Sequence, residues 1–227
     1  MAEQRSLNHF ALFSLMPAFW EASDETRAPI AQDLMRRLSG VADCVHTYSI
    51  FPTRSETDIL IWSASIAEAT DVPTSFFKGF AAATAPFRRY LKPVDTLWGF
   101  TRRSVYAGGR SAQEIDPFSS TRKPYLVIYP FAKTTEWYLM SRDSRQGMMN
   151  EHIRLGREYE DITQLLLYST GLQDCEFVVS YETDDLARFS ELVVALRDTD
   201  ARRYTLRDTP IYTAISQPLT EILAVAQ

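Results

Sequence analysis

Cysteine and histidine are scarce in this chain of 227 residues, which contains only 2 Cys and 3 His. Cys44 and Cys175 are far apart in the sequence and neither belongs to a CxxC pair, so a metal site built on cysteine is not expected. We expect both to be reduced thiols on half-buried strands. No histidine has a Cys or His partner three or four residues away, which removes the usual spacing of a structural zinc site.

The chain also lacks a basic excess, a long apolar run and a secretory leader. It has 24 Lys+Arg against 29 Asp+Glu, a formal net charge of −5, whereas sequence-independent nucleic-acid binding needs a positive field. No run reaches the roughly 18 apolar residues of a membrane helix. Residues 1–6 have neither the basic start nor the apolar core of a signal peptide. We therefore predict a cytoplasmic protein with no nucleic-acid partner and no membrane insertion.

Apolar and aromatic residues, in contrast, are plentiful. Hydrophobic residues make up 45% of the chain, with 13 Phe, 11 Tyr and 4 Trp, which is enough buried surface to exclude disorder. The length suits one large domain or two small ones.

The order of predicted elements repeats once along the chain. Each half shows the pattern strand–helix–strand–strand–helix–strand, the split βαβ or ferredoxin-like unit. In the first half the expected elements are residues 8–16, 24–39, 43–51, 57–64, 66–90 (with a break near Pro73 or Pro86) and 95–106. In the second half they are residues 124–132, 136–160, 163–169, 175–181, 184–198 and 209–216, followed by a short helix over 218–227.

The sequence thus predicts an α+β fold of tandem ferredoxin-like units, as in a dimeric α+β barrel joined into one chain. The first unit spans residues 1–106, a linker or surface loop rich in Gly, Ser, Asp and Pro spans 107–123, and the second unit spans 124–227. The two sheets could lie side by side or face to face.

The three histidines differ in their sequence surroundings. His9 opens the first strand and is expected at the surface or at an edge, and His46 is expected to be a packed or solvent-facing strand residue. His152 lies on the long helix 136–160, on the stripe that also carries Trp137, Met140, Met148, Leu155 and Tyr159. Its side chain is therefore expected to project from the apolar side of that helix.

Two interpretations of His152 remain open at this point. It is either a core histidine satisfied by a backbone carbonyl or an axial ligand of haem iron. An axial histidine needs a rigid helix, an apolar wall and a partner for its second ring nitrogen. A lone histidine can hold a metal only if a cofactor brings the other ligands, and this condition favours haem.

The strands on either side of this helix carry polar groups on otherwise apolar faces. Period-2 alternation puts Tyr129 on one face with Val127 and Phe131, and Lys133 follows at the strand's end, where it could reach a carboxylate. Gln164 shares a face with Leu166 and Tyr168. A hydrogen-bonded buried tyrosine, a solvated lysine and an edge-strand glutamine are the alternative interpretations.

These residues fall in a region that resembles the chlorite dismutase-like family of haem proteins, over about residues 120–215. The first half shares only the architecture, a tandem pair of ferredoxin-like units. The likeness is carried by Arg122-Lys123-Pro124-Tyr125, Glu136-Trp137-Tyr138, Met149-Asn150-Glu151-His152, Leu167-Tyr168-Ser169-Thr170-Gly171-Leu172, Phe177 and Tyr181-Glu182-Thr183.

The resemblance implies one of two enzymes. Part of the family converts chlorite to chloride and dioxygen, and coproheme decarboxylases use peroxide to convert coproheme III to haem b. Chlorite dismutases have a distal arginine where this chain has Gln164, or Leu165 if the alignment gap lies elsewhere, and an aliphatic residue where it has Tyr129. Both positions favour the decarboxylase. Chlorite dismutase activity and non-catalytic haem binding are the alternatives.

The resemblance also assigns roles to individual residues. His152 would ligate the iron, Tyr129 would carry a radical to the propionate, and Gln164 would offer a neutral hydrogen bond on the distal side. Lys133 would orient a propionate or shuttle a proton beside Trp137. Further cofactor contacts would come from Arg122 and Lys123, and Asp200 would be the acidic partner of the histidine. The implied partners are haem or coproheme, peroxide or chlorite, and further copies of the chain in a homopentamer.

Overall fold

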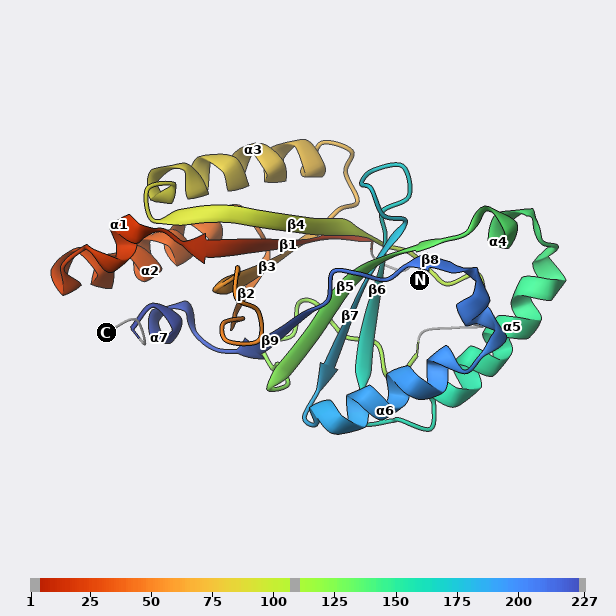
Figure 1. Ribbon diagram of the computed structural model, residues 1–227. Helices are drawn as coiled ribbons and strands as arrows, with labels where there is room; N and C mark the ends of the chain where they lie inside the picture. The colour runs from red at the N-terminus through yellow and green to blue at the C-terminus, as the bar shows by residue number, and fades with distance from the viewer. Residues whose placement is uncertain (1–4, 107–110, 225–227) are drawn as a thin grey trace.

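The computed structural model describes residues 5–106 and 111–224, which form two units of the same topology (Figure 1). The first unit contains β1 (Ser6–Leu15), α1 (Pro17–Trp20), α2 (Asp24–Leu38), β2 (Cys44–Ser49), β3 (Ile59–Ile66), α3 (Val72–Thr84), η1 (Ala85–Phe87) and β4 (Leu91–Thr101). The second contains β5 (Tyr125–Lys133), α4 (Thr135–Leu139), α5 (Arg142–Gly156), β6 (Thr163–Tyr168), β7 (Phe177–Thr183), α6 (Leu186–Arg197), η2 (Asp200–Tyr204), β8 (Thr205–Arg207), β9 (Tyr212–Ser216) and α7 (Leu219–Ala224).

The strands form one antiparallel sheet that closes on itself. The order is β7-β6-β4-β1-β3-β2-β9-β5-β8, and an additional pairing between β7 and β5 makes a closed ring of every strand except β8. Each unit contributes four strands with its first strand next to its last, and the units join at two seams, β4 with β6 and β2 with β9. The predicted α+β class with tandem ferredoxin-like units is confirmed. The two sheets are joined edge to edge into a barrel.

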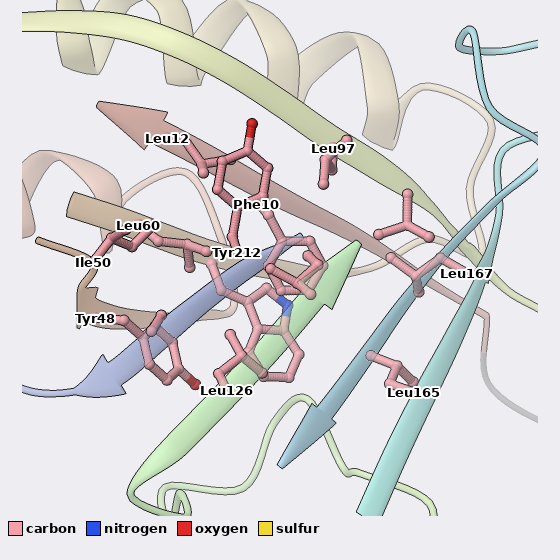
Figure 2. Close-up of a cluster of buried hydrophobic side chains, with 14 of the residues drawn as sticks. Phe10, Leu12, Tyr48, Ile50, Leu60, Leu97, Leu126, Leu165, Leu167 and Tyr212 are labelled. Carbon is pink, nitrogen blue, oxygen red and sulfur yellow. The ribbon is translucent and has the colours of Figure 1, made fainter. Parts of the chain in front are cut away.

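Apolar side chains fill the inside of the barrel and both of its outer layers. The inner cluster, part of which is shown in Figure 2, includes five residues that are 0% exposed: Phe10, Leu60, Trp62, Leu126 and Leu167. The helices α2, α3 and α7 cover the outer face of the first unit's strands (Figure 1). Burying a large apolar side chain contributes about 1.5–3 kcal/mol. Continuous burial along β1 follows from this arrangement, because both of its faces are covered.

Proline and serine set several helix boundaries. Pro73 lies in the first turn of α3, and Pro86 lies in the short η1 that follows, as expected for a residue that cannot continue a helix. The single helix predicted over 136–160 is wrong, because Met140 is extended and separates α4 from α5. Ser141 then caps α5 by accepting a hydrogen bond from the Ser144 amide at 3.2 Å.

The segment between the units is more than the surface loop we expected. Its residues 107–110 lie outside the described residues, but Glu114 forms a parallel bridge with Gln164. Ile115 is 3% exposed and belongs to the barrel core. The Gln113 side-chain amide donates to the Ile162 and Tyr159 carbonyls at 3.1 and 2.8 Å. This segment therefore attaches the end of α5 to the edge of β6.

The structure also describes the two cysteines and His46. Both cysteines are free, Cys44 partly exposed at the start of β2 and Cys175 buried just before β7. His46 is packed, with a ring nitrogen 2.9 Å from the Pro117 carbonyl.

Among residues 5–106 and 111–224, no helix is long and apolar enough to cross a membrane.

The expectation that His9 lies at the surface or an edge is wrong. Its side chain is 4% exposed and packs between the β1 face and α3, with its ring centroid 4.7 Å from Phe80 and 5.3 Å from Phe76. Its Nδ1 atom has no hydrogen-bond partner in the part of the chain that the structure describes. Burial lowers the pKa of His9 to about 4.

This burial predicts that His9 destabilises the fold in acid. Its folded pKa lies below the unfolded value, so the unfolded state binds the proton first and stability falls as the pH drops below about 6.5. At pH 5 the expected loss is about 2 kcal/mol. His9→Leu should remove that loss, which urea unfolding at pH 7.5 and pH 5 would measure for both proteins. Because the other titrating groups are shared, equal acid losses in the two proteins would contradict the prediction.

Candidate functional site

A cavity of about 1020 Å³ lies between the sheet and the helices of the second unit. Its lining comes from the outer face of β5, β6 and β7, from α5 and α6 opposite, and from residues 101–104 and 111–114 between the two units. Figure 1 shows α5 and α6 together on one side of this unit. Pockets for organic ligands typically measure about 300–1,000 Å³, so this cavity suits a large one.

The sheet wall of the cavity presents the faces that alternation predicted. Tyr129 and Phe131 line it from β5, and Gln164, Leu166 and Tyr168 line it from β6. Gln164 is exposed on this wall, whereas Leu165 is 2% exposed and belongs to the barrel core. Both residues that the sequence left open touch the cavity, but only Gln164 has its side chain exposed there, because the side chain of Leu165 packs into the barrel core.

The helix wall presents His152 from α5. No residue of α5 is buried, so the expected core-facing stripe is wrong, and this face of the helix lines the cavity instead. The His152 Nδ1 atom is shielded from solvent and has no hydrogen-bond partner among residues 5–106 and 111–224. This argues against a core histidine satisfied by a carbonyl.

Burial and charge keep the His152 imidazole neutral. Burial, and to a smaller extent the nearby Lys133 ammonium, lower its pKa to about 4. A neutral imidazole is the form that binds metals. The imidazole of His152 is therefore in the form that can bind a metal ion at neutral pH.

Lys133 lies at the end of β5 against aromatic and polar groups. Its Nζ atom is 4.6 Å from the centre of the Trp137 ring and donates to the Ala201 carbonyl at 3.3 Å and to the Thr205 hydroxyl at 3.4 Å. Burial, followed by the charge of Arg202, lowers the pKa of Lys133 to about 8. Trp137 is 4% exposed and supports Lys133 from outside the cavity lining.

Tyr129 is paired with a second tyrosine on the neighbouring strand. Its ring stacks on that of Tyr181, with the ring centroids 6.1 Å apart and the ring planes at 24°. Burial raises the pKa of Tyr129 well above its ordinary value. The phenol is therefore protonated at neutral pH.

The cavity carries more positive than negative side chains. Its cations are Lys133, Arg102, Arg103, Arg157, Arg197 and Arg202, and its carboxylates are Glu114, Glu160 and Asp208. The Asp208 carboxylate is shared by the two guanidinium groups of Arg197 and Arg202. The lining thus suits a ligand with several negative charges, although the whole chain is acidic.

Three of the predicted cofactor contacts are not on the cavity. Arg122 lies 3.2 Å from the Glu182 carboxylate, with both side chains almost fully buried, because a buried carboxylate needs a countercharge. Lys123 donates to Asp184. Asp200 is largely exposed and pairs with Arg203, so it gives no partner to His152. The structure does not support the assigned roles of Arg122, Lys123 and Asp200.

Several residues of the cavity lining were not predicted from the sequence. Tyr181 could have been found from the alternation along β7, since it shares a face with Val179. The arginines of α6 and η2 gave no such signal, because their direction depends on turns between short elements. They are Arg197 and Arg202.

Comparisons with known proteins agree on one family over most of the chain. A family model described as chlorite dismutase matches residues 23–217. The coproheme decarboxylase of Mycolicibacterium smegmatis is 30% identical over 168 residues, which cover 73% of this chain and 70% of that protein. The coproheme decarboxylase of Staphylococcus carnosus is 28% identical over 207 residues, covering 80% and 79%.

Solved structures with the same fold come from chlorite dismutases. A double mutant of the enzyme from Candidatus Nitrospira defluvii is 25% identical, with a TM-score of 0.83, and the match covers 99% of this chain and 97% of that chain. The same enzyme in complex with imidazole is 24% identical, with a TM-score of 0.82, and the match covers 98% and 95%.

Proposed function

Because this chain belongs to the chlorite dismutase family, we propose that it is a haem-dependent oxidoreductase that converts coproheme III to haem b with peroxide. Two carboxylates of the porphyrin would leave as carbon dioxide. The proposal rests on the observation that His152, Tyr129 and Gln164 line the same cavity. Relatives named coproheme decarboxylase support the same activity.

The residues of the cavity fit an iron porphyrin. His152 offers a neutral imidazole beside a space of about 1020 Å³, and it would hold the iron from the helix side. Coproheme carries four propionates, and the excess of arginine and lysine side chains in the lining would bind them. When bound, the iron would supply oxidising equivalents from peroxide.

Tyr129 and Lys133 would manage electrons and protons next to the porphyrin. Because burial raises the pKa of Tyr129, its phenol can give up an electron only together with its proton. The pKa of Lys133 is lowered to about 8, so about a tenth of the amine is neutral at pH 7 and can accept a proton that the ammonium form returns. Its ammonium form would orient a propionate.

Gln164 argues for the decarboxylase over chlorite turnover. It is the side chain exposed on the sheet wall opposite His152, and it is uncharged. An arginine there would stabilise an anionic oxychlorine group, and glutamine offers only a hydrogen bond.

The deciding experiment is to incubate the purified protein with coproheme III and peroxide and follow the porphyrin by mass spectrometry. We expect a three-propionate intermediate and then haem b, and no change in a sample without peroxide. A parallel sample receives chlorite under an oxygen electrode. Unchanged coproheme with rapid dioxygen release would replace the proposal with chlorite dismutase activity, and bound but unchanged porphyrin in both samples would indicate a haem carrier.

The finer predictions from the sequence remain proposals. These are a cytoplasmic location, a homopentameric assembly, peroxide as the oxidant and the division of the chain at residues 106 and 124.

A further inference from the structure

The backbone pairs a carboxylate, Glu114, with Gln164 on the wall of the cavity. The Ile115 amide donates to the Gln164 carbonyl at 3.0 Å, and the Gln164 amide donates to the Gln113 carbonyl at 2.7 Å, which makes Glu114 and Gln164 partners in a parallel bridge. Partners in such a bridge have their side chains on the same side, with the two backbones about 4.8 Å apart. Both residues line the cavity.

The neighbours of Glu114 fix the direction of its side chain. Ile115 is 3% exposed and packs into the barrel core, and successive side chains of an extended segment point to opposite sides. Glu114 therefore points away from the core, and it is half-buried beside the exposed side chain of Gln164. This wall lies opposite the helix that carries His152.

The other two carboxylates of the described cavity lining have different surroundings. The Asp208 carboxylate is bound by the guanidinium groups of Arg197 and Arg202. Glu160 is exposed to solvent in the connection between α5 and β6. Of these three carboxylates, Glu114 is the one that the backbone places directly beside Gln164.

We propose that Glu114 is the general base that accepts a proton from hydrogen peroxide beside Gln164. The inference rests on the proposed function, because that function makes peroxide the oxidant. In this step one O–H bond of hydrogen peroxide breaks and an O–H bond forms on the Glu114 carboxylate. The electron pair of the broken bond stays on the peroxide oxygen, so the products are the hydroperoxide anion and a carboxylic acid, and nothing is oxidised or reduced.

The chemistry of the other polar groups in the cavity favours Glu114 for this role. Hydrogen peroxide is a very weak acid, whereas ferric iron binds the anion far better than the neutral molecule. The Gln164 amide cannot accept a proton at neutral pH, but its N–H group can donate to the anion. Burial raises the pKa of Tyr129 and of Tyr181, so both phenols already hold their protons. With a pKa of about 8, Lys133 is mostly ammonium.

The test compares three small reactants of the iron in the coproheme-loaded protein, each followed by stopped-flow absorption. Hydrogen peroxide and hydrogen cyanide must lose a proton to bind as anions, whereas chlorite is already an anion at neutral pH. Glu114→Gln should slow the reactions with peroxide and with cyanide by about 100-fold, the lower end of what a positioned base contributes, and should not slow the reaction with chlorite. Glu114→Asp keeps a carboxylate and should be slowed less.

Glu158→Gln is the matched control, because it makes the same change of charge at an exposed carboxylate outside the cavity lining. It should react with all three compounds at the unsubstituted rates. Titration with coproheme comes first, and its affinity for Glu114→Gln should equal that of the control. This equality shows that the substituted cavity is intact.

The outcomes separate this inference from the function on which it rests. Unchanged rates in Glu114→Gln would overturn the role of Glu114 and place the base elsewhere, with Lys133 the next candidate. Equal slowing with all three reactants would also overturn it, because chlorite needs no base. If the unsubstituted protein forms no haem b from coproheme and peroxide, the proposed function fails, and the comparison of cyanide with chlorite still decides whether Glu114 accepts the proton.

Discussion

Replacing His152 with alanine is expected to weaken binding of iron coproheme by about 100-fold or more. Loss of a group that only supports a metal ligand already costs about 10–100-fold, and His152 is the proposed ligand itself. The cavity and its cations remain in this variant, so some porphyrin should still bind through its propionates. Titration of the protein with coproheme, followed by absorption, measures both the affinity and the change in iron ligation.

Imidazole added to His152→Ala should restore the spectrum of the ligated iron. A small neutral imidazole can enter the space that the side chain leaves, and it supplies the same donor atom. His9→Leu is the matched control, because it removes the other histidine with a pKa of about 4 but lies far from the cavity, in the first unit. If His152→Ala binds iron coproheme with unchanged affinity and spectrum, His152 is not the ligand.

The fold was largely predictable because periodicity and element order depend on local sequence. Alternation correctly placed Tyr129 with Phe131, and Gln164 with Leu166, on one face of their strands. Closure of the barrel was not predictable, because the seams β4–β6 and β2–β9 pair residues more than sixty positions apart. The helix break at Met140 was missed, since its backbone departs from the helix without a proline or glycine nearby.

The candidate site was predictable only where a residue's direction follows from its own element. His152 and Gln164 satisfied that condition. Arg122 did not, because its ion pair with Glu182 depends on a strand about sixty residues later. His9 was misjudged because the residues that bury it, Phe76 and Phe80, belong to α3.

Total charge and local charge carry different information in this protein. The net charge of −5 describes the whole chain, whereas the cavity gathers arginines from α6, from η2 and from the residues that directly follow β4 and α5. A polyanionic porphyrin needs only these few cations, because each guanidinium group binds a carboxylate through local charge-assisted hydrogen bonds. An acidic protein can therefore bind a ligand with four carboxylates.

Replacing Tyr129 with phenylalanine is expected to reduce decarboxylation by about 100-fold or more, with coproheme affinity unchanged. Phenylalanine keeps the ring that packs beside Phe131 and Tyr181 but lacks the hydroxyl that would lose a proton and an electron together. Mass analysis of the porphyrin over time measures the rate, and absorption titration measures binding.

Tyr125→Phe is the matched control for this prediction, because it makes the same change on the same strand but outside the cavity. It should decarboxylate at the unsubstituted rate. If Tyr129→Phe forms haem b as fast as this control, the radical does not pass through Tyr129. Should the substituted protein instead stop after one carboxylate, Tyr129 would serve one propionate, and a different oxidisable group in the cavity would have to serve the other.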